Sequence, residues 1–179
     1  VYGIPSFRLE KSVIEAEIEV LQAMGIEFKC GIEVGKDITL DDLRKEGYEA
    51  FYVAIGAQGS RKLNIPGEDN EMVISGIDFL RKVNKTEDSN LISGDVVVVG
   101  GGNVAIDVAR AALRSGAENV HLYSLEQEDE MPASPEEVSE AREEGILLHC
   151  GWGPKEILEE SIVFKPVSYT HLTLPTICS

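Results

Sequence analysis

The residues best suited to chemistry form one glycine-rich run, Gly100-Gly101-Gly102-Asn103-Val104-Ala105. The run matches G-x-G-x-x-A, follows a valine-rich strand predicted over 95–99, and opens a helix predicted over 103–115. Gly100 permits a tight turn, Gly102 lets a diphosphate approach the backbone, and Ala105 keeps the helix close to the sheet. The pattern predicts that the diphosphate of a dinucleotide binds at the helix N-terminus. The alternative is a helix–sheet turn that binds no ligand.

An acidic residue follows the next strand of the pattern. A second strand is predicted over 120–125, and Glu126 comes directly after it. A carboxylate at this place accepts hydrogen bonds from the adenosine ribose and favours NAD, whereas an arginine accommodates the 2′-phosphate of NADP. No arginine lies between His121 and Met131. The sequence therefore predicts NAD rather than NADP, the alternative being a solvated acidic loop.

A second glycine turn comes earlier in the chain. Residues 49–56 are predicted to form a buried strand that runs into Ala54-Ile55-Gly56-Ala57. A hydrophobic strand that ends in small residues lets the backbone approach a cofactor. Many buried strands end in this way, so the turn is a weak signal by itself.

Other kinds of catalytic site find no support in the sequence. No Ser/His/Asp or Cys/His arrangement is present, so we expect no catalytic acid, base or nucleophile. No Cys-x-x-Cys motif occurs, so we expect neither a redox disulfide nor a metal or iron–sulfur site in this chain. His149 lies on a predicted apolar strand and Trp152 between two glycines, and both are expected to serve packing.

Hydrophobic periodicity predicts an α/β fold. After residue 94 the elements follow a β-α-β-α-β order, which is typical of a doubly wound, Rossmann-type parallel sheet. The third helix of the chain is expected at 77–83. The connection between the two domains is expected over 78–94, with its polar stretch at Lys85–Gly94. The other predicted elements are helices over 11–24, 40–46 and 134–145 and strands over 26–30 and 146–150.

Composition narrows the class of protein. The chain has 179 residues and a formal net charge of −16, from 16 Lys and Arg against 32 Asp and Glu. This acidic balance argues against binding nucleic acid through a broad basic face. No apolar run approaches the ~20 residues of a membrane span, so we expect no membrane insertion. Three scattered cysteines indicate a reducing, cytoplasmic setting.

The two ends of the sequence are unusual. The chain starts at Val1 and enters directly on Tyr2-Gly3-Ile4-Pro5, as the middle of a longer protein would. Residues 167–179 contain no charged side chain and resemble a translated sequencing adapter. They are expected to form a non-native tail, and the alternative is a natural strand and loop.

Several spaced motifs together resemble one family. They are Tyr2-Gly3-Ile4-Pro5 with Arg8-Leu9, Ala54-Ile55-Gly56-Ala57, Ile65-Pro66-Gly67-Glu68-Asp69, Gly100–Ala105 with Asp107 and Arg110, and Glu130-Met131-Pro132-Ala133. In this order they resemble the small (beta) subunit of glutamate synthase and its relatives, which include the flavin part of dihydropyrimidine dehydrogenase. The resemblance covers residues 1–166.

The resemblance implies a flavin-dependent oxidoreductase that takes hydride from NAD(P)H onto FAD and passes electrons to iron–sulfur clusters or a partner subunit outside this chain. It also implies a partial FAD-binding domain over 1–77 and a partial NAD(P)-binding domain over 95–166. Ala54 to Ala57 would contact FAD, and Gly3, Ile4 and Pro5 would lie close to the flavin.

Two departures from the family pattern matter. The first FAD fingerprint would precede Val1, so the chain is expected to hold FAD weakly or not at all and to be inactive alone. Many relatives carry Tyr-Arg-Arg where this chain has Ser124-Leu125-Glu126, which supports NAD. The alternative function is a non-catalytic NAD-binding regulatory or interaction module.

Overall fold

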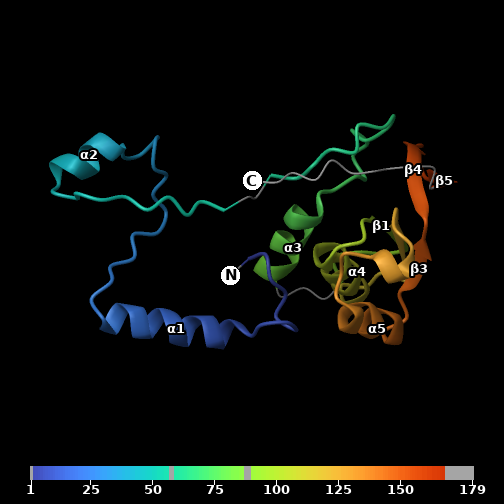
Figure 1. Cartoon of the computed structure of the whole chain (residues 1–179), viewed down its shortest axis with the longest axis horizontal. Coiled ribbons are helices and arrows are strands. Elements are labelled where there is room, and N and C mark those ends of the chain that lie inside the picture. Colours follow the sequence, from blue (N-terminus) through green and yellow to red (C-terminus); the bar gives the residue numbers. More distant parts are fainter. Residues whose placement is uncertain (1, 57–58, 87–89, 168–179) are drawn as a thin grey trace. The chain divides into compact units, whose positions relative to one another are not determined.

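The computed structural model describes residues 2–56, 59–86 and 90–167. The chain divides into two compact units (Figure 1): unit 1 comprises Val1–Arg8 with Ser60–Ser179, and unit 2 comprises Leu9–Gly59. The domain limits near residues 77 and 94 that the sequence suggested stay a prediction. The first eight residues belong to the same unit as the glycine-rich run.

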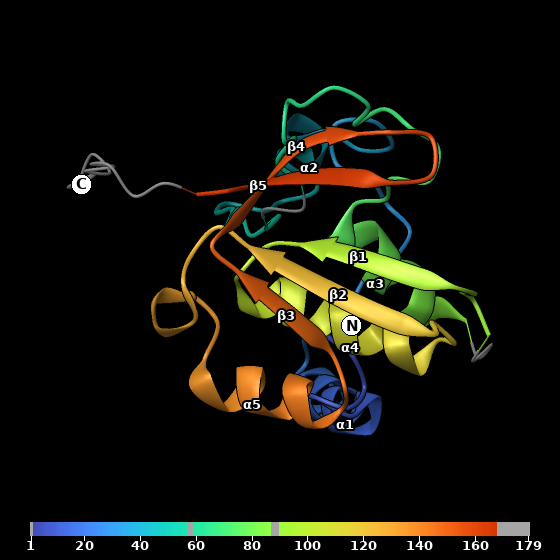
Figure 2. The same ribbon diagram turned by 90° about the vertical axis from the view of Figure 1, so that its right-hand side faces the viewer.

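A three-stranded parallel sheet forms the centre of unit 1. Strands β1 (Asp95–Val99), β2 (Asn119–Ser124) and β3 (Leu147–Cys150) lie in the order β1-β2-β3 (Figure 2). Val97 is paired with His121, and His121 with Leu147, so all three strands end at the same edge. The predicted Rossmann-type α/β fold is confirmed.

Two crossover helices, α4 (Asn103–Arg114) and α5 (Pro135–Glu143), connect these strands. Helix α4 packs against β1, β2 and α5, and helix α3 (Gly76–Lys85) packs against α4. Ile106 of α4 and Leu122 of β2 are completely buried in this core. Ser134 caps α5 as its sequence predicts, because its Oγ accepts the N–H of Glu137.

The other face of the sheet carries a row of rings. The ring of Tyr123 stacks between His149 and Phe164, with ring centroids 4.4 and 3.7 Å away. His121 Nδ1 and His149 Nε2 are 3.0 Å apart and share one hydrogen bond. Burial, with a smaller effect from His121, lowers the pKa of His149. His149 therefore packs within the sheet, as its place on an apolar strand suggested.

An antiparallel hairpin follows the sheet and was not predicted. It comprises β4 (Trp152–Ile157) and β5 (Ile162–Pro166), with an irregularity between Pro154 and Glu156. The residues of β4 include glycine, proline, lysine and glutamate, which are poor strand formers in isolation. Pairing with β5, which puts Ile157 opposite Ile162, stabilises β4 as a strand. Ile157 N–H also donates to Pro66 O at 2.8 Å, which joins the hairpin to the preceding loop.

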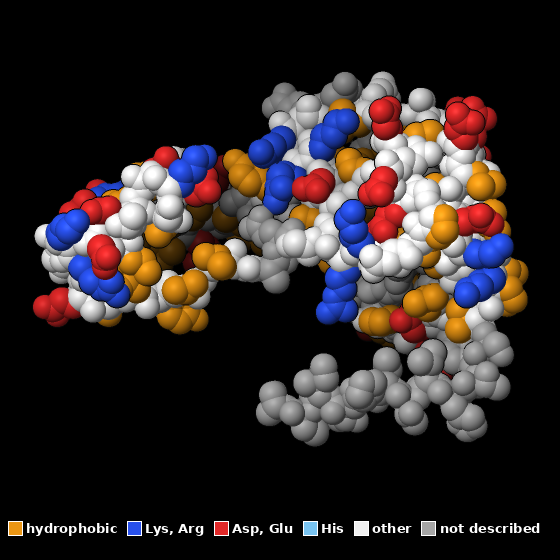
Figure 3. Space-filling view, turned by 90° about the horizontal axis from the view of Figure 1, so that it is seen from above, with side chains coloured by type: hydrophobic (Ala, Val, Ile, Leu, Met, Phe, Trp, Pro, Cys, Tyr) orange, Lys and Arg blue, Asp and Glu red, His pale blue; other side chains and the backbone are white. Residues whose placement is uncertain are grey.

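Unit 2 contains helices α1 (Lys11–Ala23) and α2 (Leu40–Lys45), both close to their predicted limits. The strands predicted over 26–30 and 49–56 were wrong: neither segment is a strand. A strand needs a neighbour for its N–H and C=O groups, and no described segment pairs with either one. No described side chain of this unit is buried, and hydrophobic side chains are visible on its surface (Figure 3).

Candidate functional site

The glycine-rich run leaves β1 in a backbone conformation that requires glycine. Gly100 has φ of +147°, and its N–H donates to Tyr123 O at 2.9 Å. A Cβ atom at this position would lie 3.2 Å from the Cβ of Ala105. Gly100 therefore makes the sharp turn that its sequence position predicts, and its missing side chain leaves room for the methyl group of Ala105.

The N-terminus of α4 is open. Gly102 is the N-cap residue with no capping side chain, and nothing lies within 4 Å of where its Cβ would be. Ala105 N–H and Ile106 N–H both donate to Gly102 O, at 2.9 and 3.2 Å. The N–H groups of Asn103 and Val104 precede these bonds, so they have no acceptor within the helix. An anion is favoured here by these donors and by the helix dipole.

Glu126 lies beside this run. A Cβ at Gly101 would be only 2.7 Å from Glu126 Oε2, so the carboxylate occupies the space that the glycine leaves. The two residues come from neighbouring strand ends, Gly101 after β1 and Glu126 after β2. The structure therefore brings together the two features that the sequence singled out separately.

The segment before α5 is bonded to the glycine run. Ala133 N–H donates to Gly101 O at 3.0 Å, and Ser134 N–H donates to Asn103 Oδ1 at 2.9 Å. The Asn103 side chain is thus engaged in structure, while its backbone N–H stays available to a ligand. These tertiary bonds are not evident from the sequence. The nearest signal was the Glu130–Ala133 motif, which carried no physical role of its own.

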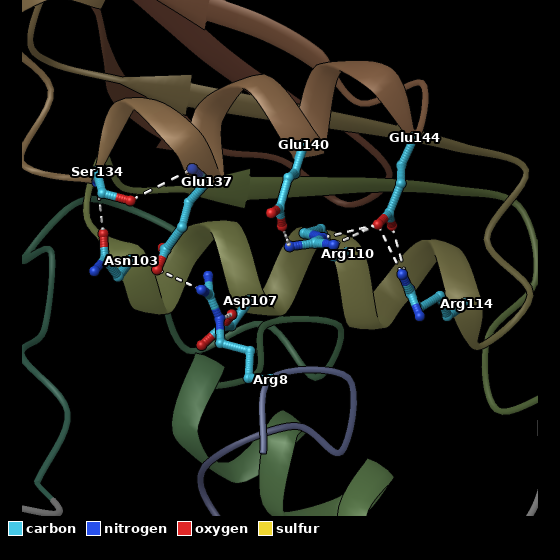
Figure 4. A network of polar contacts seen from close by, with 9 residues as sticks. All are labelled: Arg8, Asn103, Asp107, Arg110, Arg114, Ser134, Glu137, Glu140 and Glu144. Carbon is cyan, nitrogen blue, oxygen red and sulfur yellow. Dashed lines mark hydrogen bonds and ion pairs between the residues drawn. The ribbon is translucent and has the colours of Figure 1, made fainter. Parts of the chain in front are cut away.

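Ion pairs hold α4 and α5 side by side (Figure 4). Arg110 bonds Glu140 and Glu144, each at 2.6 Å, and Arg114 bonds Glu144 at 2.7 Å. The hydrogen bond from Arg114, together with Arg110, lowers the pKa of Glu144 despite its partial burial. The N-termini of both helices consequently lie together, beside the glycine run.

The first residues of the chain join this network. Arg8 bonds both Asp107 of α4 and Glu137 of α5. Burial raises the pKa of Asp107, and the hydrogen bond from Arg8 opposes that rise. Phe7 lies under the guanidinium groups of Arg110 and Arg114, 4.8 and 4.4 Å from its ring centre. The N-terminal segment is thereby fixed to the two helices.

The residues that the resemblance assigned to FAD divide between the two units. Gly3, Ile4 and Pro5 belong to unit 1, where Pro5 is buried and Ile4 is half-exposed. Ala54, Ile55 and Gly56 belong to unit 2 and are exposed, Ile55 by 82%. Ala57 lies outside the described residues. Their role in binding FAD stays a prediction.

A cavity of about 510 Å³ adjoins Leu125, the residue before Glu126. It lies between the loop before Pro66 and the hairpin. Its lining residues are Leu63, Ile65, Leu125, Gly153, Pro154, Lys165, Pro166 and Val167.

Within the described part of the chain, no three His, Cys, Asp or Glu side chains gather closely enough to hold a metal ion. In the same part, no helix has the length and apolar character needed to cross a membrane.

Sequence comparison identifies the family. Residues 9–173 match pyridine nucleotide-disulphide oxidoreductases. The chain belongs to this family of oxidoreductases. Within the family, it is 40% identical over 174 residues to the NADP(+)-dependent formate dehydrogenase subunit beta of Moorella thermoacetica, covering 96% of this chain and 24% of that protein.

Two further relatives confirm the resemblance that the sequence motifs predicted. The glutamate synthase [NADPH] small chain of Escherichia coli K12 is 39% identical, with 81% of this chain and 33% of that protein aligned. The NAD-dependent dihydropyrimidine dehydrogenase subunit PreT of Escherichia coli K12 is 35% identical, with 92% and 39% aligned. The chain therefore spans about a quarter to two-fifths of the length of these relatives.

Solved structures agree on the fold. The NADPH complex of the Mycobacterium tuberculosis oxidoreductase FprA superposes with a TM-score of 0.74 at 20% identity, over 94% of this chain and 55% of that one. At this identity the likeness shows that the two chains share a fold and no more.

Proposed function

We propose that the chain contributes a nicotinamide-dinucleotide site to a flavin-dependent oxidoreductase, with NADH preferred over NADPH. Hydride passes from the dinucleotide to FAD, and electrons continue to iron–sulfur clusters or a partner subunit. Residues 95–166 bind the dinucleotide, and residues 1–77 contribute to the FAD site. The observation that carries the proposal is the carboxylate of Glu126 beside Gly101, at the N-terminus of α4.

The chain's own residues fit a dinucleotide at this place. The open N-terminus of α4 receives the diphosphate, and Gly102 offers no side chain to obstruct it. Glu126 accepts a hydrogen bond from the ribose 2′-hydroxyl, the kind of charge-assisted bond that contributes roughly 1.5–3 kcal/mol. When bound, the nicotinamide supplies hydride chemistry, and the protein orients and shields it.

The same carboxylate opposes NADPH. A 2′-phosphate about 4 Å from Glu126 would be repelled by about 4 kcal/mol per pair of unit charges at an effective dielectric near 20. Solvent at this open site reduces that figure. We expect a preference for NADH on the order of 10²-fold, or about 2.7 kcal/mol. One relative is named for NADPH and another for NAD, so the family alone does not determine the coenzyme. The proposed preference therefore rests on the residues of this chain.

The proposed contribution to an FAD site rests on the unburied segment Phe51–Gly56. Phe51 to Gly56 are apolar or small but are not buried in this chain, and unit 2 has no described buried side chain. Such a segment is suited to packing against further polypeptide or a flexible cofactor. The fit supports a shared FAD site rather than a complete one within these residues.

Dissociation constants of NADH and NADPH for the 179-residue chain test the nucleotide site. We expect NADH to bind more tightly, and the double variant Leu125→Arg/Glu126→Arg to lose or reverse the preference. Asp129→Arg is the matched control, because Asp129 lies in the acidic 3₁₀ helix Glu128–Glu130 that follows Glu126 and is not among the residues nearest a Cβ at Gly101. An equal shift in the control would assign the effect to the charge of the loop. A wild-type preference for NADPH would contradict the role of Glu126.

Rapid reduction of bound FAD by NADH in a protein extended at both ends of residues 1–179 tests electron transfer. We expect the visible flavin absorbance to bleach within the time of turnover. Dinucleotide binding without any flavin in that protein would favour the alternative, a regulatory module that binds NAD without turnover.

A further inference from the structure

We propose that Ser124 is a positioning residue for coenzyme choice, because it holds Glu126 over the glycine run. The inference rests on the proposed NADH site and adds a residue that does not contact the coenzyme itself. Ser124 is the last residue of β2 and is completely buried, whereas Glu126 reaches the site.

Two hydrogen bonds converge on the backbone of Glu126. Ser124 Oγ donates to Glu126 O at 2.8 Å, and Gly151 N–H donates to the same oxygen at 2.9 Å. The Ser124 hydroxyl is also 3.3 Å from Glu126 Oε2, so its single proton is shared between the main-chain oxygen and the carboxylate. Residue 126 is therefore fixed from inside the fold, and its carboxylate is directed toward Gly101.

Ser124 packs into the space that the missing side chain of Gly101 leaves. A Cβ at Gly101 would be 3.3 Å from both the Cβ and the Oγ of Ser124. Glycine at position 101 therefore accommodates Ser124 together with the carboxylate of Glu126. Removal of the hydroxyl alone leaves this packing in place, which makes Ser124→Ala a clean test.

The Ser124 hydroxyl matters because holding the Glu126 carboxylate in one orientation costs side-chain entropy. An exposed glutamate loses rotamer freedom when it is held in one orientation. Without the Ser124 bond, the Glu126 carboxylate can turn into solvent, so its interaction with the ribose hydroxyl and its repulsion of a 2′-phosphate both weaken. We expect the NADH-to-NADPH affinity ratio to fall about fivefold, which equals about 1 kcal/mol.

The experiment is a double-mutant cycle on this ratio, measured by ligand binding to the 179-residue chain. The variants are Ser124→Ala, Glu126→Ala and the pair. Ser124→Ala is expected to lower the ratio in the wild-type background and to have no effect on it in the Glu126→Ala background. Ser124→Cys, whose thiol is a weak donor, should fall between serine and alanine. Ser115→Ala is the matched control, because Ser115 is a buried serine at the other end of α4.

Different results separate the two proposals. If Glu126→Ala leaves the ratio at its wild-type value, Glu126 does not set coenzyme choice and both proposals fail. If Glu126→Ala abolishes the preference but Ser124→Ala retains it, only the role of Ser124 is refuted. An equal effect of Ser124→Ala in both backgrounds would also refute it, since a general loss of structure acts without Glu126. Thermal melts of every variant verify that the fold is intact.

Discussion

Substitution of Gly102 by alanine should separate stability from dinucleotide binding. Gly102 has φ of −94°, which alanine adopts readily, and nothing lies within 4 Å of the added methyl group. Alanine is a poorer N-cap than glycine by about 0.5 kcal/mol, but it lowers the entropy of the unfolded chain by a similar amount. The free energy of unfolding should therefore change by less than about 0.5 kcal/mol, a shift of about 2 °C in Tm.

The same methyl group should weaken binding strongly. It occupies the space through which a diphosphate approaches the free N–H groups of α4. Loss of one charge-assisted hydrogen bond, which is worth roughly 1.5–3 kcal/mol, raises the Kd for NADH by about 10- to 100-fold. Gly100→Ala should instead lower the stability of the fold. Its φ of +147° disfavours alanine, so about 2 kcal/mol of stability is lost before binding is considered.

Calorimetric titration with NADH and thermal melts of each variant test this contrast. Gly59→Ala is the matched control, because Gly59 also has free space around it and no left-handed φ, and it belongs to unit 2. The control should change neither binding nor Tm by much. If Gly102→Ala binds NADH as tightly as the wild type, the diphosphate does not lie on this helix N-terminus. A large loss of Tm in Gly102→Ala would also refute the reasoning.

Three further predictions follow from the contacts of unit 1 and the exposure of unit 2. Arg110→Met should lower the free energy of unfolding in urea by about 2 kcal/mol, because the ion pairs of Arg110 with Glu140 and Glu144 are lost while Glu144 keeps Arg114. No change in that free energy would show that these ion pairs do not stabilise the fold. Glu144 has a lowered folded pKa, so its stabilisation is present above its unfolded pKa and is lost as pH falls through the folded value. The stability difference between wild type and Glu144→Gln should thus narrow from about pH 5 to pH 3, and a constant difference would contradict the pairing. The 179-residue chain should purify colourless, because Ile55 and its neighbours are exposed; stoichiometric flavin absorbance would overturn the expectation of an incomplete FAD site.

Much of unit 1 could be predicted because its signals are local. The valines of 95–99, the glycine stop after α4 and the Ser134-Pro135 start of α5 each act within a few residues. Helical hydrogen bonds join residues four apart, so a helix carries its own partners in the sequence. Parallel strands separated by such helices have few alternative arrangements, which is why the order β1-β2-β3 was within reach.

Tertiary structure decided the rest, because strands and sites depend on partners outside their own segment. The apolar pattern of 49–56 predicts a strand, yet no described segment supplies its hydrogen bonds. The pattern of β4 does not predict a strand, yet β5 pairs with it. The sequence placed Glu126 after a strand, but only the fold set its carboxylate against Gly101 and bonded Ser124 beneath it. A residue type shows which interactions it can make, and the distances between strand ends determine which of them form.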